Sequence, residues 1–194
     1  TGSGSEPSTK PVPNVGIDST NDSGAEATSD TNGSFAVPNL AGNVTVRTLP
    51  KFGTPRASDH NDAISSFDAT LIARHSVQLI TLTGKQQLAG DVSGNGVVTA
   101  FDAGLVSKFV AQQIDHLPVA TTKGSDWEFL RCDGYPTCSN PTYVYTPIAG
   151  PEVADFYALL FGDVSGNWQQ ATTLASSARS SAAEQEELEA IEND

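Results

Sequence analysis

The chain has few basic residues, no methionine and no long hydrophobic run. Lysine and arginine number 10 against 23 aspartates and glutamates, which gives a net charge of −13. Such a surface repels phosphate backbones and anionic lipids, so it disfavours nucleic acid and membrane partners. No apolar run approaches the roughly 18 residues that span a bilayer. A surplus of carboxylates suits a protein that recruits divalent cations, although it also serves solubility alone.

The sequence opens on Thr1 without a basic-then-apolar leader, and methionine is absent throughout. We therefore expect a processed piece of a longer precursor. The 2 cysteines, Cys132 and Cys138, stand in CDGYPTC, a short loop that contains Gly and Pro. A disulfide forms there if the backbone brings the two Cα atoms within about 7 Å. It would predict an oxidising, extracellular setting, and the alternative is two buried or free thiols.

The chain divides by composition into arms, β segments and a helical segment. Residues 1–13 are rich in Gly, Ser, Thr and Pro and predict a flexible arm, and residues 169–194 predict an acidic solvated tail. A β pattern runs over 14–50 and returns over 124–162, so we expect one composite β-sandwich. SFAVPNL reads as one of its strands, and the Asn-Gly pair before it predicts a tight hairpin turn. Three sequons are possible glycosylation sites, namely Asn21, Asn32 and Asn43.

Between these β segments the sequence repeats itself at a spacing of 34 residues, with SSFDATLIARHSVQLI answered by TAFDAGLVSKFVAQQI. Apolar residues recur three or four positions apart in each copy, as in Leu105, Val106, Phe109 and Val110. This spacing predicts two short helices that pack face to face within residues 57–117.

The second copy begins with DVSGNGVVTAFD, residues 91–102, which has the pattern of an EF-hand calcium loop. Its candidate ligands at loop positions 1, 3, 5, 7 and 12 are Asp91, Ser93, Asn95, Val97 and Asp102. Calcium takes six to eight oxygen ligands, and Gly96 permits the sharp bend that such a loop needs. The alternative is a Gly- and Asn-rich turn before an aspartate that starts a helix.

The first copy is incomplete, because it offers Asp59, Asn61 and Asp68 but has Ala57 where the first carboxylate belongs. Either Asp62 or another segment completes the loop, or it binds nothing. GDVSGNW, near the end of the chain, repeats the opening of the intact loop and supplies the half-site Asp163, Ser165 and Asn167. We hypothesise that residues 163–168 fold back beside the first copy and join it through one ion.

These motifs carry a resemblance to known families. GDVSGNGVVTAFDAGLVSKFVAQQI and its degenerate partner resemble the tandem F-hand repeats of type I dockerins, and PVPNVGIDS…SDTNGSFAVPNLAGNVTV resembles the carboxypeptidase-regulatory-like, prealbumin-type β-sandwich. The combination is similar to modules of bacterial and archaeal surface proteins. It implies calcium at the five candidate ligands of the second loop, and in part at the first loop.

The chain departs from these families in two places. Dockerins that dock on cohesins present small polar residues at loop positions 10 and 11, whereas this chain has Phe67 and Phe101 at position 11. We expect both rings to pack inward against the β region. The sandwich family also opens with a strand that is missing here, which predicts an open edge able to pair with a neighbouring chain.

Catalysis is not expected. His60, His75 and His116 have no nucleophile motif beside them, and Asp126 and Glu128 have the spacing of a solvated pair on a strand. We therefore predict an α+β fold, an immunoglobulin- or prealbumin-like antiparallel sandwich with an inserted dockerin-like helix pair. The predicted function is non-catalytic: a calcium-stabilised extracellular or cell-surface subunit that assembles with its own copies into filaments. The alternative is a module that docks on a cohesin-like receptor. One calcium ion is expected, and two or three are possible.

Overall fold

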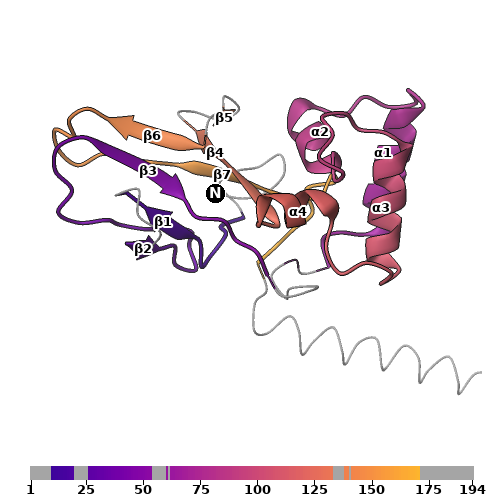
Figure 1. Cartoon of the computed structure of the whole chain (residues 1–194), viewed down its shortest axis with the longest axis horizontal. Coiled ribbons are helices and arrows are strands. Elements are labelled where there is room, and N and C mark those ends of the chain that lie inside the picture. Colours follow the sequence, from indigo (N-terminus) through magenta and orange to yellow (C-terminus); the bar gives the residue numbers. More distant parts are fainter. Residues whose placement is uncertain are drawn as a thin grey trace, which may run out of the picture.

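The computed structural model describes residues 10–19, 26–53, 60, 62–132, 138–139 and 141–170, with backbone only at 132, 138 and 139. These residues form two antiparallel sheets on one side and a group of helices on the other (Figure 1). Segments from both ends of the described chain build the sheets, and the helices come from its middle. The fold is therefore α+β, with the helical part inserted between β segments as predicted.

The first sheet has four strands in the order β2-β1-β3-β6, and the second has three in the order β5-β4-β7. In chain order the strands are β1 Gly16–Asp18, β2 Ala27–Thr28, β3 Val44–Thr48, β4 Trp127–Cys132, β5 Cys138–Ser139, β6 Thr142–Tyr145 and β7 Phe156–Leu160. Alternate residues of β3 are buried, as expected for a strand with one face on a core. All five residues of β7 are buried.

Side chains from both sheets meet in one hydrophobic core. Ile17 and Val46 of the first sheet belong to the same buried cluster as Phe129 and Phe156 of the second. The ring of Tyr143, on β6, meets that of Phe156, on β7, edge to face at 5.4 Å between centroids. Burial of this apolar surface between the sheets is the main force that holds them together.

The helical part contains α1 Ser66–Ser76, α2 Gly84–Gly90, α3 Ala100–Val110 and α4 Pro118–Lys123. Helices α1 and α3 start 34 residues apart and pack against each other, which confirms the helix pair that the repeat predicted. Each buries equivalent residues, such as Ile72 in α1 and Val106 in α3. The shorter helices α2 and α4 were not predicted. None of the helices among the described residues is long and apolar enough to cross a membrane.

Two local predictions about the β region were wrong. Residues 34–40 carry no strand, because Pro38 lacks an amide hydrogen and Asn39 has a φ of 62°. The predicted turn at Asn32-Gly33 is present. The Asp30 side chain stabilises it by accepting hydrogen bonds from the Asn32 and Ser34 amides. It does not join two strands, so the expected hairpin is absent.

Other predicted features are partly visible. Asn32 and Asn43 are exposed, whereas Asn21 lies outside the described residues. Cys132 on β4 is the direct cross-strand partner of Cys138 on β5. Their side chains are outside the described part, so the disulfide stays a prediction, as does the acidic tail. The predicted arm of residues 1–13 is wrong at its end, because Val12 is only 4% exposed and belongs to the hydrophobic core, whereas residues 1–9 lie outside the described part.

The chain crosses from the sheets to the helices after β3, returns before β4, and turns back toward the helices after β7 (Figure 1). This last crossing is fixed to α2. The Gly162 amide donates to the Ala89 carbonyl at 2.8 Å, and the Gln86 side chain donates to the Val164 carbonyl at 3.2 Å. The end of β7 therefore delivers residues 163–168 to the helical part.

Candidate functional site: an intact and a composite loop

The intact loop, residues 91–102, is organised around its first carboxylate. Asp91 Oδ1 accepts hydrogen bonds from the Ser93 hydroxyl and from the Gly94 and Asn95 amides, at 3.0 to 3.2 Å. Its Oδ2 accepts from the Gly96 amide at 2.7 Å. Gly94 and Gly96 have φ of 74° and 91°, values that favour glycine. The loop thus turns around Asp91, as the sequence pattern required.

The last carboxylate of the loop, Asp102, belongs to the first turn of α3 and is fully buried. Its Oδ1 accepts from the Ser93 amide at 2.9 Å, and its Oδ2 accepts from the amide and hydroxyl of Thr99 at 2.9 and 3.0 Å. Thr99 in turn caps the helix by accepting from the Phe101 amide. One carboxylate therefore ties the start of the loop to the start of the helix.

Residues 163–168 form the first half of a second loop of the same shape. Asp163 Oδ1 accepts from the Ser165 hydroxyl and from the Gly166 and Asn167 amides, at 2.7 to 3.2 Å. Its Oδ2 accepts from the Trp168 amide at 3.1 Å. Gly166 has a φ of 68°, close to that of Gly94. Each of these contacts has its counterpart around Asp91.

The second half of this loop comes from the first turn of α1. Asp68 Oδ1 accepts from the Ser165 amide at 2.8 Å, across 97 positions of sequence. Its Oδ2 accepts from the amide and hydroxyl of Ser65, both at 2.9 Å. Asp68 and Ser65 thus do for α1 what Asp102 and Thr99 do for α3. We call residues 163–168 with 65–68 the composite loop, and its assembly is what the fold-back hypothesis required.

The two carboxylates of the composite loop are buried close together. Burial raises the pKa of Asp163, and the nearby charge of Asp68 raises it further, against hydrogen bonds that lower it. The ammonium group of Lys10 contacts the Gly166 carbonyl, so one cationic side chain reaches the loop. Two buried carboxylates that interact unfavourably are stabilised by a bound cation.

The donor chemistry of both loops fits calcium. Each offers two carboxylates, a serine hydroxyl and an asparagine side-chain oxygen, and calcium takes oxygen ligands only. Among the described residues, no group of three or more His, Cys, Asp or Glu side chains is placed to hold a metal.

Not every predicted ligand can be placed. Asp59 and Asn61 lie outside the described residues, and Asp62 is exposed. The amide that reaches Asp68 comes from Ser165, which corresponds to Ser93 at position 3 of the intact loop. Asp163, two positions before Ser165, therefore corresponds to Asp91 at position 1 of the intact loop, the position at which the sequence of the first copy has Ala57. Val97, whose carbonyl is the predicted ligand at position 7 of the intact loop, is exposed.

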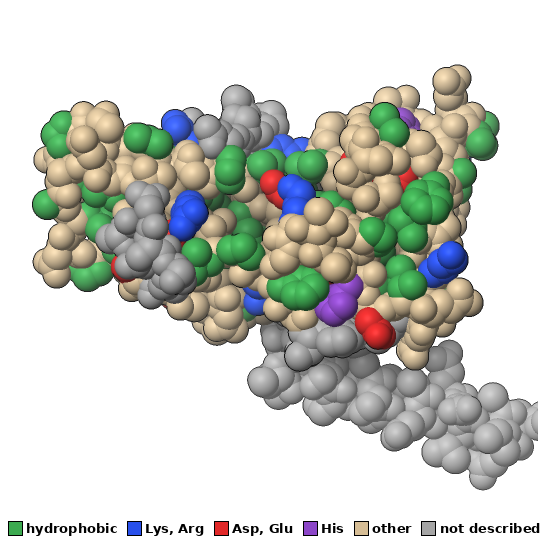
Figure 2. Space-filling view, viewed as in Figure 1, with side chains coloured by type: hydrophobic (Ala, Val, Ile, Leu, Met, Phe, Trp, Pro, Cys, Tyr) green, Lys and Arg blue, Asp and Glu red, His purple; other side chains and the backbone are tan. Residues whose placement is uncertain are grey.

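The prediction that Phe67 and Phe101 pack inward was wrong. Their exposed fractions are 58% and 62%, among the highest of the large hydrophobic residues. Each is the second residue of its helix and precedes the buried Asp68 or Asp102, so the same turn that buries the carboxylate points the ring outward. Hydrophobic side chains lie on the visible surface of the helical part in Figure 2.

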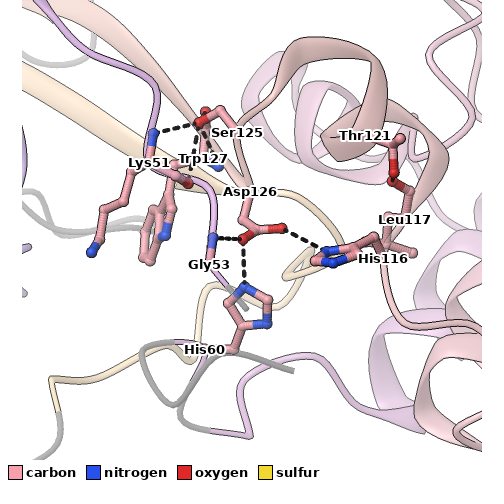
Figure 3. Close-up of polar contacts among 9 residues, drawn as sticks. All are labelled: Lys51, Gly53, His60, His116, Leu117, Thr121, Ser125, Asp126 and Trp127. Atoms are coloured by element: carbon pink, nitrogen blue, oxygen red, sulfur yellow. Dashed lines mark hydrogen bonds and ion pairs between the residues drawn. The ribbon is translucent and has the colours of Figure 1, made fainter. Parts of the chain in front are cut away.

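The sequence did not predict a polar cluster at the junction of the sheets and helices, in which His60 and Asp126 are buried and His116 is half-buried. Asp126 Oδ2 accepts from the Gly53 amide at 2.8 Å and lies 3.4 Å from His60 Nε2, while Oδ1 lies 3.9 Å from His116 Nδ1 (Figure 3). The expectation that Asp126 is solvated was therefore wrong. Gly53 and His60 lie between β3 and α1, His116 lies between α3 and α4, and Asp126 directly precedes β4, so no local pattern links them. Glu128 instead pairs with Lys123 at 2.6 Å.

Comparison with known proteins bears on the helical part. Residues 58–111 match the family model of the dockerin type I domain. No curated protein and no solved structure matches the chain, so the sheets receive no family assignment. The match ends well before Asp163, which leaves half of the composite loop outside it. Dockerin domains generally bind calcium and mediate protein–protein interaction. The helical segment is therefore a dockerin-like module.

Proposed function

We propose that the chain is a non-catalytic, calcium-stabilised extracellular module that docks on a cohesin-like protein through the exposed face of α1 and α3. The observation that carries this proposal is the pair Phe67 and Phe101. Both rings are more than half exposed at equivalent places on two packed helices, although exposing a phenylalanine costs hydrophobic free energy. Exposed aromatic residues in repeated positions are typical of a protein-binding surface.

The charge on this face supports a particular kind of partner. Arg74 and Lys108 stand in the last turns of α1 and α3, both exposed, and each is two helical turns from a phenylalanine. The aspartates of the same helices are buried, although the whole chain carries a net charge of −13. The face thus combines aromatic and basic groups, and an apolar partner surface rimmed by carboxylates would complement it.

Calcium is proposed to bind at both loops, with structural effect. In the intact loop the ligands would be Asp91, Ser93, Asn95, Asp102 and the Val97 carbonyl. In the composite loop they would be Asp163, Ser165, Asn167 and Asp68. The bound ion would supply positive charge that offsets the paired carboxylates and fixes the first turn of each helix.

Docking is tested by surface plasmon resonance with a panel of purified cohesin domains, in calcium and in chelator. We expect calcium-dependent binding that the Phe67→Ala/Phe101→Ala double variant weakens by about 2–4 kcal/mol, as for truncation of buried interface anchors. Val144→Ala is the matched control, because Val144 is 59% exposed but lies on β6. Equal binding by the double variant and the control would refute the proposed surface.

Self-assembly through the sheets is the second proposal, and one observation favours it. A cavity of about 630 Å³ lies between the sheets beside the edge strand β7, lined mostly by apolar side chains such as Val15, Phe35 and Phe156. The pocket is open to solvent, so an extended segment from a second copy could enter it and pair with the edge of the sheet, as in strand addition to a sandwich of immunoglobulin or prealbumin type. Light scattering of the purified chain with calcium tests this: ordered polymers support it, and a monomer contradicts it.

A further inference from the structure

The helices α1 and α3 are equivalent, but their first turns are held by different parts of the chain. Around α3, the amide that reaches Asp102 comes from Ser93, nine positions away in the same loop. Around α1, the amide that reaches Asp68 comes from Ser165, which follows the last strand of the sheets. The start of α1 therefore depends on a tertiary contact that α3 does not need.

Several apolar contacts are made together with that hydrogen bond. Val164 and Trp168 are each only 1% exposed, so the segment buries two large side chains when it seats. Gly162 passes so close to Ile64 and Leu117 that an added Cβ would lie 3.0 to 3.1 Å from their side chains. Ile64 directly precedes Ser65, the residue that caps α1. Packing and capping at this end of α1 thus share one segment.

Electrostatics oppose this seating when no cation is bound. Asp68 is fully buried and Asp163 nearly so, and both accept hydrogen bonds from Ser165, so two carboxylates of like charge lie close together away from solvent. Hydrogen bonds from amides and hydroxyls offset part of that repulsion. A divalent cation between the carboxylates would turn the repulsion into attraction on both sides.

We propose that the composite loop is a calcium-operated clip: it sets the Phe67 end of the docking face only while residues 163–168 are seated on α1. The Phe101 end is set by the intact loop alone. Calcium at the clip therefore couples one half of the docking face to the attachment of the sheets. This inference rests on the proposed docking function for its biological meaning, but the closure of the clip is independent of any partner.

The clip contains its own optical reporter. The chain has 2 tryptophans, and the rings of Trp127 and Trp168 meet edge to face at 5.0 Å between centroids and 89°. The Trp168 amide donates to Asp163 Oδ2 at 3.1 Å. Near-ultraviolet circular dichroism of this rigid pair consequently follows the composite loop, whereas the sequence of the intact loop holds no tryptophan.

The test compares Asp163→Ala with Asp91→Ala in the full chain, because both aspartates occupy the same place in an identical GDVSGN hexapeptide. Isothermal titration calorimetry should show that each variant binds about one calcium ion per chain fewer than the wild type. Only Asp163→Ala should also lose the calcium-dependent tryptophan signal. Hydrogen exchange should show protection of the first turn of α1 reduced on the order of tenfold in Asp163→Ala, with α3 unchanged, and the reverse in Asp91→Ala.

The clip would be overturned if Asp163→Ala reduced hydrogen-exchange protection equally in α1 and α3, or if it left the protection of α1 unchanged. If Asp163→Ala fails to fold, Asp163→Asn replaces it, since it keeps one acceptor oxygen while it removes the charge; a wild-type calcium count and tryptophan signal in Asp163→Asn would equally overturn it. No partner enters these measurements. A chain that shows the expected signals but binds no cohesin domain leaves the clip intact and refutes the docking proposal alone.

Discussion

The intact and composite loops place the same atoms around the same kind of carboxylate, but they are joined differently. Twelve consecutive residues build the first, whereas a strand end and a helix start, 97 positions apart, build the second. Val92 and Val164, the second residues of the two loops, are equally buried. The comparison teaches that a loop of this type needs its two halves in place, and not the peptide bonds between them. The composite loop forms only when the contacts that bring the end of β7 to the helices are also made.

The largest expected effect comes from Trp168, which the intact loop replaces with Gly96. Trp168→Ala should lower the free energy of unfolding by about 3–5 kcal/mol, because truncating a buried tryptophan loses packing and leaves a cavity. Urea denaturation followed by far-ultraviolet circular dichroism measures this change. Phe101→Ala is the control, since exposed substitutions cost about 0.5 kcal/mol or less. Similar losses in the two variants would mean that the composite loop is not part of the core.

The next largest effect on stability should come from removing calcium, and two single-site variants allow it to be measured for each loop by itself. In Asp91→Ala only the composite site remains, and in Asp163→Ala only the intact site. An ion present at a hundred times its dissociation constant stabilises the folded chain by about 2.7 kcal/mol. We therefore expect each variant to lose about that amount of unfolding free energy when saturating calcium is replaced by chelator. Urea denaturation under the two conditions measures the difference. A variant whose stability does not respond to chelator would lack its remaining site.

Gly162 and Gly90 precede the two loops and offer a sharper contrast. Gly162 has a φ of 92° and an added Cβ would lie 3.0 Å from the Leu117 side chain, whereas Gly90 ends α2 within the helix. Gly162→Ala should cost about 1–3 kcal/mol, because the new residue would be strained in that conformation. Gly90→Ala would place its Cβ 3.3 Å from Val164 without such strain, so a smaller loss is expected. Thermal unfolding of both variants decides, and equal losses would contradict this account.

The smallest effect should come from the helix caps. Ser65→Ala and Thr99→Ala each remove a capping hydroxyl that also donates to a carboxylate, at a cost of about 1 kcal/mol. If the composite loop holds its helix start less firmly than the intact loop does, calcium should change the destabilisation by Ser65→Ala and that by Thr99→Ala by different amounts. Denaturation of both variants with and without calcium measures this difference. Identical costs under both conditions would show that the two helix starts are equally secure.

The helical part was largely predictable because its signals are local. The 34-residue repeat predicted the positions of α1 and α3, and the spacing of Leu105, Val106 and Phe109 predicted the buried face of α3, although Val110 is exposed. The outward direction of Phe67 and Phe101 was missed, because it follows from burying the neighbouring aspartates. The cluster of His60, His116 and Asp126 left no signal, since its members meet only when both crossings between sheets and helices are in place.

The hexapeptide GDVSGN occurs twice and separates what each level of structure decides. In both copies the sequence by itself determined the turn, because an aspartate that accepts the following amides and a glycine with positive φ suffice to form it. What precedes and completes the turn was decided by tertiary structure. One copy follows a helix and closes on its own downstream aspartate, and the other follows a strand and closes on Asp68. The physical reason is that hydrogen bonds within six residues are local, whereas the partner carboxylate is supplied by whichever helix start the packed sheets bring within reach.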